Sequence, residues 1–298
     1  MNYLGLILDG RLSFEDYFSR VARRTEQAAL SLSRLMPNMG RPGIVTRRLF
    51  AGVIASIALY ASPVWVERVR KGRTIRSALR AAERRIAGRI ICSYKTVSHA
   101  MCTALAGTPP LELTAEYHAE TYFEVSKLRS RTGSVAAPPD EVRQIRERGR
   151  LRLLDRWRSW ISVSEQRGNE TLVALRDCLP RWVEARIGLT YRATQILTGH
   201  GCFGRYLRRI GKETTERCWH CVASRDTASH TLVRCPAWAA QRASLRNIVG
   251  SDLSMGSVIR ALLSEEGRGA FLSFAERVMS AKEASERIRE GIPAASGR

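Results

Sequence analysis

The chain has 298 residues, and 44% of them are hydrophobic, which excludes wholesale disorder and suffices for one large or two or three smaller domains. Lysine and arginine number 49 against 28 acidic residues, a formal net charge of +21. Such an excess opposes compaction unless an acidic partner is near. Nucleic acid is the commonest such partner, and a membrane surface is the alternative.

The N-terminal stretch 2–14 alternates weakly and carries Asp9-Gly10 at its centre, which predicts a β-hairpin. Ser13 is the expected N-cap of a helix that runs to about Met36.

No basic and apolar leader pattern follows Met1, and seven cysteines are an odd number for full pairing. We therefore expect no signal peptide and an intracellular, reducing location.

Residues 49–66 form an uncharged run that just reaches the length of a membrane-spanning helix. Pro63 should end that helix near Ser62 and leave the span too short. We predict a buried core helix over 44–62, with a spanning helix as the alternative.

The stretch 74–92 predicts an amphipathic helix with an arginine row at steps of three and four: Arg73, Arg76, Arg80 and Arg84. Such a row could follow the phosphates of a duplex. A solvated face on a core helix is the alternative interpretation.

The remainder predicts a mainly α fold. We expect a short helix after 97, a Gly-Thr-Pro-Pro break, a longer helix to about Arg131, and a linker over 132–141. A basic helix capped by Asp140 should run through about Ile161, followed by helices near 171–178 and 190–198. A glycine-rich basic segment spans 197–211, residues 236–281 have a helical pattern, and the tail after Gly291 is expected to be disordered.

The motif Cys218-x2-Cys221-x8-His230-x4-Cys235 offers three thiolates and one imidazole, a ligand set that suits tetrahedral zinc. If Asp226 caps a short helix through about Val233, His230 lies on it, and Pro236 ends it beside Cys235. Four protein ligands predict one closed, structural zinc ion per chain, without a position for a catalytic water.

Other residues near the motif have a structural and a functional interpretation. His220 is the rival imidazole, but it lies between the first two cysteines and is poorly placed to complete their tetrahedron. Trp219 and Trp238 could stack on bases or pack around the metal loop. Cys92, Cys102, Cys178 and Cys202 have no ligand spacing and are interpreted as small buried apolar residues.

No catalytic constellation is present in this sequence. Its seven aspartates are dispersed, and neither a phosphate-binding Gly-x4-Gly-Lys-Ser loop nor a Gly-x-Ser-x-Gly motif occurs. The pairs His99 with Cys102 and His200 with Cys202 are interpreted as structural. We predict no catalytic residue.

The chain resembles the C-terminal portion of the polymerase polyprotein of arthropod non-LTR retrotransposons of the type-1 clade, which inserts into ribosomal RNA genes. The resemblance covers the chain almost end to end. It rests on YLGLILDGRLSFEDYF at 3–18, LYASPVW ending at Trp65, SYKTVSHAMCTALAGTPPLEL at 93–113, LTGHGCFGRYLRRIG at 197–211, and CWHC with DTASHTLVRCPAWAAQR up to Arg242.

The resemblance implies a map: a palm-edge hairpin over 1–14, a thumb-like region over 15–131, and a helical linker over 132–196. A basic segment with a zinc knuckle follows over 197–245, then a C-terminal helix with a flexible tail over 246–298. In such polyproteins an endonuclease and a reverse transcriptase precede this region, so their catalytic residues would lie before Met1. The fragment is expected to be inactive alone.

Three functions remain open. The chain could bind element RNA or target DNA in the nucleus during target-primed reverse transcription, through the arginine row and through Arg205, Arg208 and Arg209. It could instead stand for a reverse transcriptase, an RNA-directed DNA polymerase, whose palm is missing here. It could also be a domesticated zinc-binding adaptor for proteins, whose binding would depend little on salt.

Overall fold

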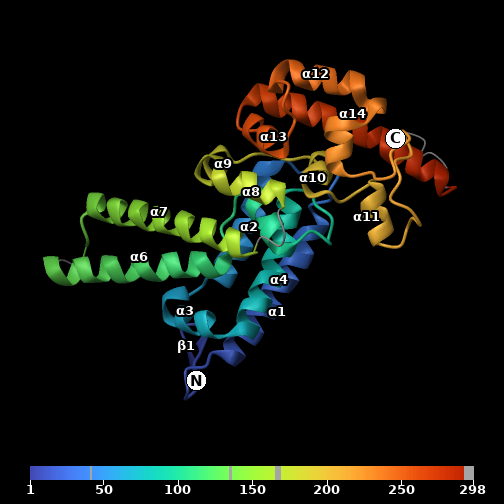
Figure 1. Ribbon diagram of the computed structural model, residues 1–298. Coiled ribbons are helices and arrows are strands. Elements are labelled where there is room, and N and C mark those ends of the chain that lie inside the picture. Colours follow the sequence, from blue (N-terminus) through green and yellow to red (C-terminus); the bar gives the residue numbers. More distant parts are fainter. Residues whose placement is uncertain (41, 134–135, 165–168, 292–298) are drawn as a thin grey trace. The chain divides into compact units, whose positions relative to one another are not determined.

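A computed structural model describes residues 1–40, 42–133, 136–164 and 169–291, which are mainly helical with one small sheet (Figure 1). Two compact units are formed, one by Met1–Ile90 with Cys102–Ser164 and the other by Ile91–Met101 with Glu165–Arg298. The predicted tail after Gly291 and part of the predicted linker 132–141 lie outside the described residues.

The sheet pairs β1 (Asn2–Tyr3) with β2 (Leu6–Ile7) in antiparallel register. Its turn lies at Leu4-Gly5, both with positive φ, so the predicted turn at Asp9-Gly10 is wrong. The Asp9 carboxylate instead accepts hydrogen bonds from the backbone amides of Arg11, Ser13 and Phe14. These bonds, the one from Ser13 foremost, hold the Asp9 pKa at about 2. Asp9-Gly10 therefore marks a side-chain-stabilised loop between the hairpin and the next helix.

Helix α1 (Glu15–Arg34) begins after Phe14, which is buried and left-handed at the N-cap position. The prediction of Ser13 as the N-cap is wrong, because the helix begins one residue later and Phe14 holds that position without a side-chain cap. Phe14, Tyr17, Phe18 and Trp65 form a chain of edge-to-face ring contacts. These rings form the centre of the core of the first unit.

The uncharged run forms two helices, α2 (Ile44–Ala58) and α3 (Ser62–Lys71), which meet at 83°. The prediction of one buried helix over 44–62 is wrong, because Pro63 lies in the first turn of α3 rather than ending α2. Val45, Leu49 and Val53 also leave an apolar stripe of α2 exposed. Among the described helices, none alone is long and apolar enough to cross a membrane, and only this bent pair passes that test jointly.

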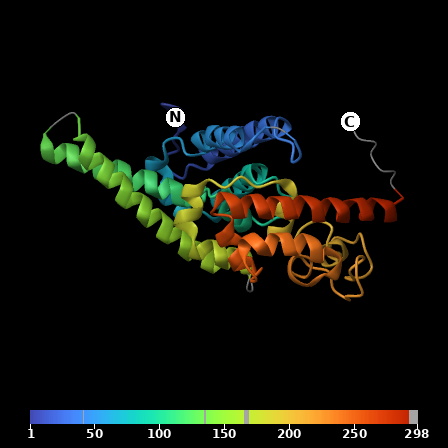
Figure 2. The same ribbon diagram turned by 90° about the horizontal axis from the view of Figure 1, so that it is seen from above.

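Four helices complete the first unit: α4 (Arg73–Ile90), α5 (His99–Ala106, which begins in the second unit), α6 (Leu111–Thr132) and α7 (Pro139–Ser164). Helices α6 and α7 lie side by side as a helical hairpin (Figures 1 and 2). Asp140 is the second residue of α7, so the prediction that it caps this helix is wrong. The predicted boundary between the thumb-like region and the linker, at 131/132, lies inside the first unit.

An acidic row on α6 forms ion pairs with four arginines of this unit. Glu112, Glu116, Glu120 and Glu124 follow one another at helical spacing of four. They pair with arginines of α3, α4 and α7: Arg70, Arg80, Arg152 and Arg156. Half-exposed pairs of this kind contribute little individually. Their main consequence is that the excess of positive charge is only partly available to a partner.

The second unit contains seven α-helices among its described residues beyond 168: α8 (Glu170–Asp177), α9 (Leu179–Ala185), α10 (Tyr191–Thr198), α11 (Gly204–Arg209), α12 (Ala239–Val249), α13 (Met255–Ala261) and α14 (Glu265–Arg289). The predicted helices near 171–178, 190–198 and 236–281 are present, whereas α9 was not predicted. Helix α14 buries Phe271, Phe274, Val278 and Met279 and packs against α10 and α12 (Figure 2).

Candidate metal centre

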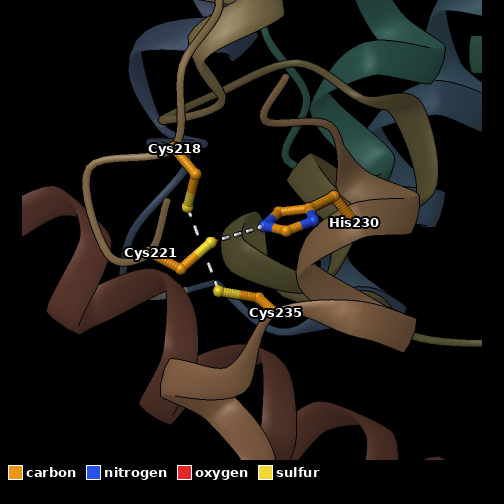
Figure 3. A group of neighbouring side chains, drawn as sticks. All are labelled: Cys218, Cys221, His230 and Cys235. Atoms are coloured by element: carbon orange, nitrogen blue, oxygen red, sulfur yellow. Dashed lines mark hydrogen bonds between the residues drawn. The ribbon is translucent and has the colours of Figure 1, made fainter. Parts of the chain in front are cut away.

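The four predicted ligands converge. One donor atom from each of Cys218, Cys221, His230 and Cys235 lies within 4.8 Å of all the others (Figure 3). The Sγ atoms of Cys218 and Cys235 are 3.9 Å apart, and Sγ of Cys221 is 3.3 Å from Nε2 of His230. A tetrahedron with metal–sulfur bonds of about 2.3 Å has edges of about 3.8 Å. The donor set and its spacing therefore fit a zinc ion.

Burial shifts the pKa values of three of the donor groups. It raises the pKa of the Cys218 thiol to about 12 and also raises the pKa of Cys235. Burial lowers the pKa of His230, which keeps its imidazole neutral at neutral pH. A metal ion binds thiolate and neutral imidazole, so it would displace protons from the buried thiols and none from His230.

Local hydrogen bonds close the metal loop. The amide of Cys218 donates to the carbonyl of Ala223 at 2.9 Å, and the amide of Asp226 donates to the carbonyl of Glu216 at 2.6 Å. The single turn η1 (His230–Arg234) then carries the histidine, and Cys235 follows it directly. Pro236 begins the next short turn, η2 (Pro236–Trp238), which confirms its predicted role in ending the helix at this point.

Asp226 does not have the capping role that we predicted. The side chain of Thr227 accepts the hydrogen bond from the amide of His230, at 3.0 Å. The buried carboxylate of Asp226 accepts from the amide of Gly204, the hydroxyl of Thr231 and the Nζ atom of Lys282. Asp226 therefore joins the metal loop to α11 and to α14.

Lys282 is the residue that sequence reasoning missed. It is 1% exposed, and its Nζ atom lies 2.7 Å from Oδ2 of Asp226 and 5.3 Å from the ring centre of Phe203. In sequence it is an ordinary lysine on a helix 56 residues after Asp226. One feature of the sequence could have indicated its burial: Lys282 follows Val278 and Met279 by four and three residues, so it lies on the same apolar face of α14.

A second buried cation supports the site from α12. Arg242 is 5% exposed and donates to the backbone carbonyls of Thr231 and Cys235. Burial lowers the pKa of this guanidinium. Arg242 thus fixes the backbone on both sides of η1, and with it the spacing between His230 and Cys235.

Gly204 allows α11 to approach the metal loop closely. A Cβ atom there would lie 2.6 Å from the carbonyl oxygens of Glu216 and Arg217, just before the first ligand. Only glycine permits this approach of α11 to the metal loop.

Gly204→Ala is therefore expected to destabilise the second unit by about 1–3 kcal/mol and to weaken zinc binding, because the backbone before Cys218 must move. Urea unfolding and competition with a chromophoric chelator measure the two effects. Gly269→Ala is the matched control, since a Cβ at Gly269 meets nothing within 4 Å. Equal behaviour of the two variants would contradict the close-approach argument.

The rival residues of the motif lie outside the ligand group. His220 packs against Trp238, with ring centres 4.9 Å apart, and Trp238 is buried. The guanidinium groups of Arg217 and Arg289 lie over the ring of Trp219 at 3.7 and 4.7 Å. Both tryptophans thus make intramolecular contacts. Of the remaining cysteines, Cys92, Cys102 and Cys202 are buried as predicted, and Cys178 is half-buried.

The seven arginines predicted to contact nucleic acid differ in availability. Arg80 forms an ion pair at 2.6 Å with Glu112, which also accepts from Trp160. Arg208 lies 3.7 Å from Glu216. Arg73, Arg84, Arg205 and Arg209 are exposed, and Arg76 is half-buried. Among described residues, these last five have no ion pair with a carboxylate.

Comparison with known proteins reveals relatives along most of the chain. The 115 kDa protein in type-1 retrotransposable element R1DM of Drosophila melanogaster is 24% identical over 93% of the chain, and the chain spans 27% of its length. The Pol polyprotein from element R1 4 of Nasonia vitripennis is 24% identical over 95% of the chain and 72% of its own length. The R1 Pol polyprotein of Popillia japonica is 28% identical over 44% of the chain.

No protein-family model and no solved structure matches the chain. The evidence for its origin therefore comes from the three retrotransposon relatives. Two of them match more than nine-tenths of the chain. The chain is homologous, over most of its length, to Pol polyproteins of insect type-1 retrotransposable elements.

Proposed function

We propose that the chain is a nucleic-acid-binding segment from the C-terminal portion of a retrotransposon reverse-transcriptase polyprotein. In this role it binds template RNA or target DNA in the nucleus during target-primed reverse transcription, and the polymerase and endonuclease chemistry belongs to other parts of the polyprotein. The observation that carries the proposal is a Cys₃His group that could hold a metal ion, in a chain of charge +21 that is related to Pol polyproteins.

In this proposal zinc is a structural cofactor. All four ligand positions are filled by the protein, so zinc would supply folding energy rather than an activated water. Cys218, Cys221, His230 and Cys235 would hold it. Asp226 and Arg242 would keep the loop and the turn η1 in the geometry that the metal requires. The thumb-like role of residues 15–131 and the linker role of 132–196 belong to the same proposal.

The set of α4 arginines that we propose to bind phosphate is smaller than the row predicted from sequence. Because Arg80 pairs with the half-buried row of α6, we assign the phosphate contacts to Arg73, Arg76 and Arg84. Each phosphate that a cation neutralises contributes about −0.9 to the log–log salt slope on duplex DNA and about −0.7 on single strands.

The triple variant Arg73→Gln, Arg76→Gln and Arg84→Gln is therefore expected to weaken duplex binding and to flatten the salt slope by up to about 2.7. Fluorescence anisotropy over a salt series measures both. Arg80→Gln is the matched control: it should leave the slope unchanged, because its charge is already paired with Glu112. An unchanged slope in the triple variant would make the row a solvated face.

One observation favours a second function, a zinc-stabilised adaptor for a protein partner. Val45, Leu49 and Val53 form an exposed apolar stripe on α2, and their exposed fractions are 80, 64 and 47%. An adaptor would bind its protein with little dependence on salt. The salt series on nucleic acid therefore separates the two functions: a flat or absent response favours the adaptor.

A further inference from the structure

Arg209 is held in place by neutral groups. Its Nη2 atom donates to Nε2 of His200 at 2.9 Å, and its guanidinium lies 5.0 Å from the ring centre of Tyr206. Nδ1 of His200 lies 2.9 Å from the carbonyl oxygen of Thr198. Because a carbonyl can only accept, Nδ1 carries the proton and Nε2 offers its lone pair to Arg209. The arginine is thus oriented by an imidazole and an aromatic ring.

Neither partner neutralises the charge of Arg209. Arg80, Arg192 and Arg208 are also ordered, but each of them contacts a glutamate. Arg209 has no carboxylate partner among the described residues, and it is exposed. A cation that is oriented, exposed and uncompensated can receive an anion without first breaking an ion pair and with little loss of side-chain entropy.

The support under Arg209 is buried and hydrogen-bonded. Tyr206 is 5% exposed, its hydroxyl lies 2.9 Å from that of Thr96, and its ring packs 5.9 Å from the ring of Tyr94. Arg205 lies one helical turn before Arg209 on α11 and is exposed without a carboxylate partner in the described chain. Residues four apart on a helix share a face, so the two guanidinium groups can approach one anion or two successive ones.

The same short helix is anchored to the metal loop. The amides of Gly204 and Arg205 donate to the side chain and to the backbone carbonyl of Asp226, at 3.2 and 3.0 Å. The position of Arg205 and Arg209 therefore depends on the ordered loop that carries Cys221 and His230.

We infer that Arg205 and Arg209 form a phosphodiester-binding site on α11, with His200 and Tyr206 as positioning residues. This inference rests on the proposed function and assigns its contact point in the second unit. The ligand is the nucleic-acid backbone rather than a base, because the ring of Tyr206 is buried and covered by Arg209 and offers no face for stacking. Binding at this site is consequently independent of base sequence.

The test measures binding of the full chain to labelled single-stranded RNA, single-stranded DNA and duplex DNA over a salt series, by fluorescence anisotropy. Arg209→Gln should weaken binding about tenfold at low salt. It should also flatten the salt slope by about 0.7 on single strands or about 0.9 on duplex. The loss should be equal for two unrelated base sequences, and the nucleic acid that shows the larger loss identifies the backbone that occupies the site.

Two variants separate positioning from charge. His200→Phe removes the acceptor and keeps Arg209, so it should weaken binding and leave the slope unchanged. Arg208→Gln is the matched control on the same helix; its charge faces Glu216, so binding should weaken less than about threefold. Zinc content and circular dichroism establish that each variant is folded. If Arg209→Gln does not fold, Arg209→Lys replaces it and should weaken binding with an unchanged slope, because it keeps the charge and loses the planar fork.

The outcomes are distinguishable. If the unaltered chain binds none of the three nucleic acids, the proposed function and this inference both fail. If it binds and Arg209→Gln resembles Arg208→Gln, the site on α11 is wrong while the proposed function stands. If His200→Phe flattens the slope as much as Arg209→Gln does, His200 has no positioning role.

Discussion

Cys218→Ser is expected to abolish stoichiometric zinc binding by the full chain and to unfold the loop from 218 to 235. The reason is that a structural Cys/His site supplies about 10–16 kcal/mol of apparent binding energy at neutral pH, which adds to the hydrogen bonds that close the loop. A serine hydroxyl does not ionise at this pH and is a poor zinc ligand. Titration with zinc, followed by competition with a chromophoric chelator, measures the loss.

Matched residues in the chain make this result specific. His230→Ala should lose zinc as Cys218→Ser does, whereas His220→Ala should retain it, because the ring of His220 packs on Trp238 outside the ligand group. Cys178→Ser should also retain one zinc, since Cys178 lies outside the cluster. Loss of zinc in the His220 variant alone would replace His230 by His220 as the fourth ligand.

Lys282→Met is expected to destabilise the second unit by about 3–5 kcal/mol, because it leaves the carboxylate of Asp226 buried without its cation. Asp226 also holds Gly204 and Thr231, so the loss should extend to zinc affinity. Urea unfolding of the zinc-bound chain measures the stability. The double variant Asp226→Asn with Lys282→Met should recover part of it, because no charge remains uncompensated.

The control is Lys212, an exposed lysine that pairs with the residue following α14. Lys212 contacts Glu290 at 2.9 Å, but its side chain is 50% exposed. Lys212→Met should therefore cost at most about 1 kcal/mol. If Lys282→Met lowers the free energy of unfolding no more than Lys212→Met does, another group compensates the charge of Asp226. The proposed link between the metal loop and α14 is then wrong.

Errors in the sequence-based prediction of secondary structure have local causes. Asp9-Gly10 has the composition of a hairpin turn. The Asp9 carboxylate, however, accepts hydrogen bonds from three backbone amides and stabilises a loop there. The two strands turn at Leu4-Gly5 instead. Pro63 was expected to end a helix and instead lies in the first turn of α3. Proline is compatible with both positions, so the residue type alone does not distinguish them.

The sequence by itself determined the mainly helical fold and the metal-ligand group. Both depend on short-range information: helical periodicity within one segment, and donor atoms close enough in sequence for one loop and one turn to bring them together. The excess of positive charge was also readable from composition.

Only the tertiary structure decided which charges are available and what supports the metal loop. Arg80 and Arg209 look alike in sequence, yet α6 brings Glu112 to the first, and the turn after α10 brings His200 to the second. Asp226 and Lys282 lie 56 residues apart and meet only because α14 packs beside the loop. Pairing between distant residues depends on packing geometry, because the free energy of a buried charge is set by its neighbours in space rather than in sequence.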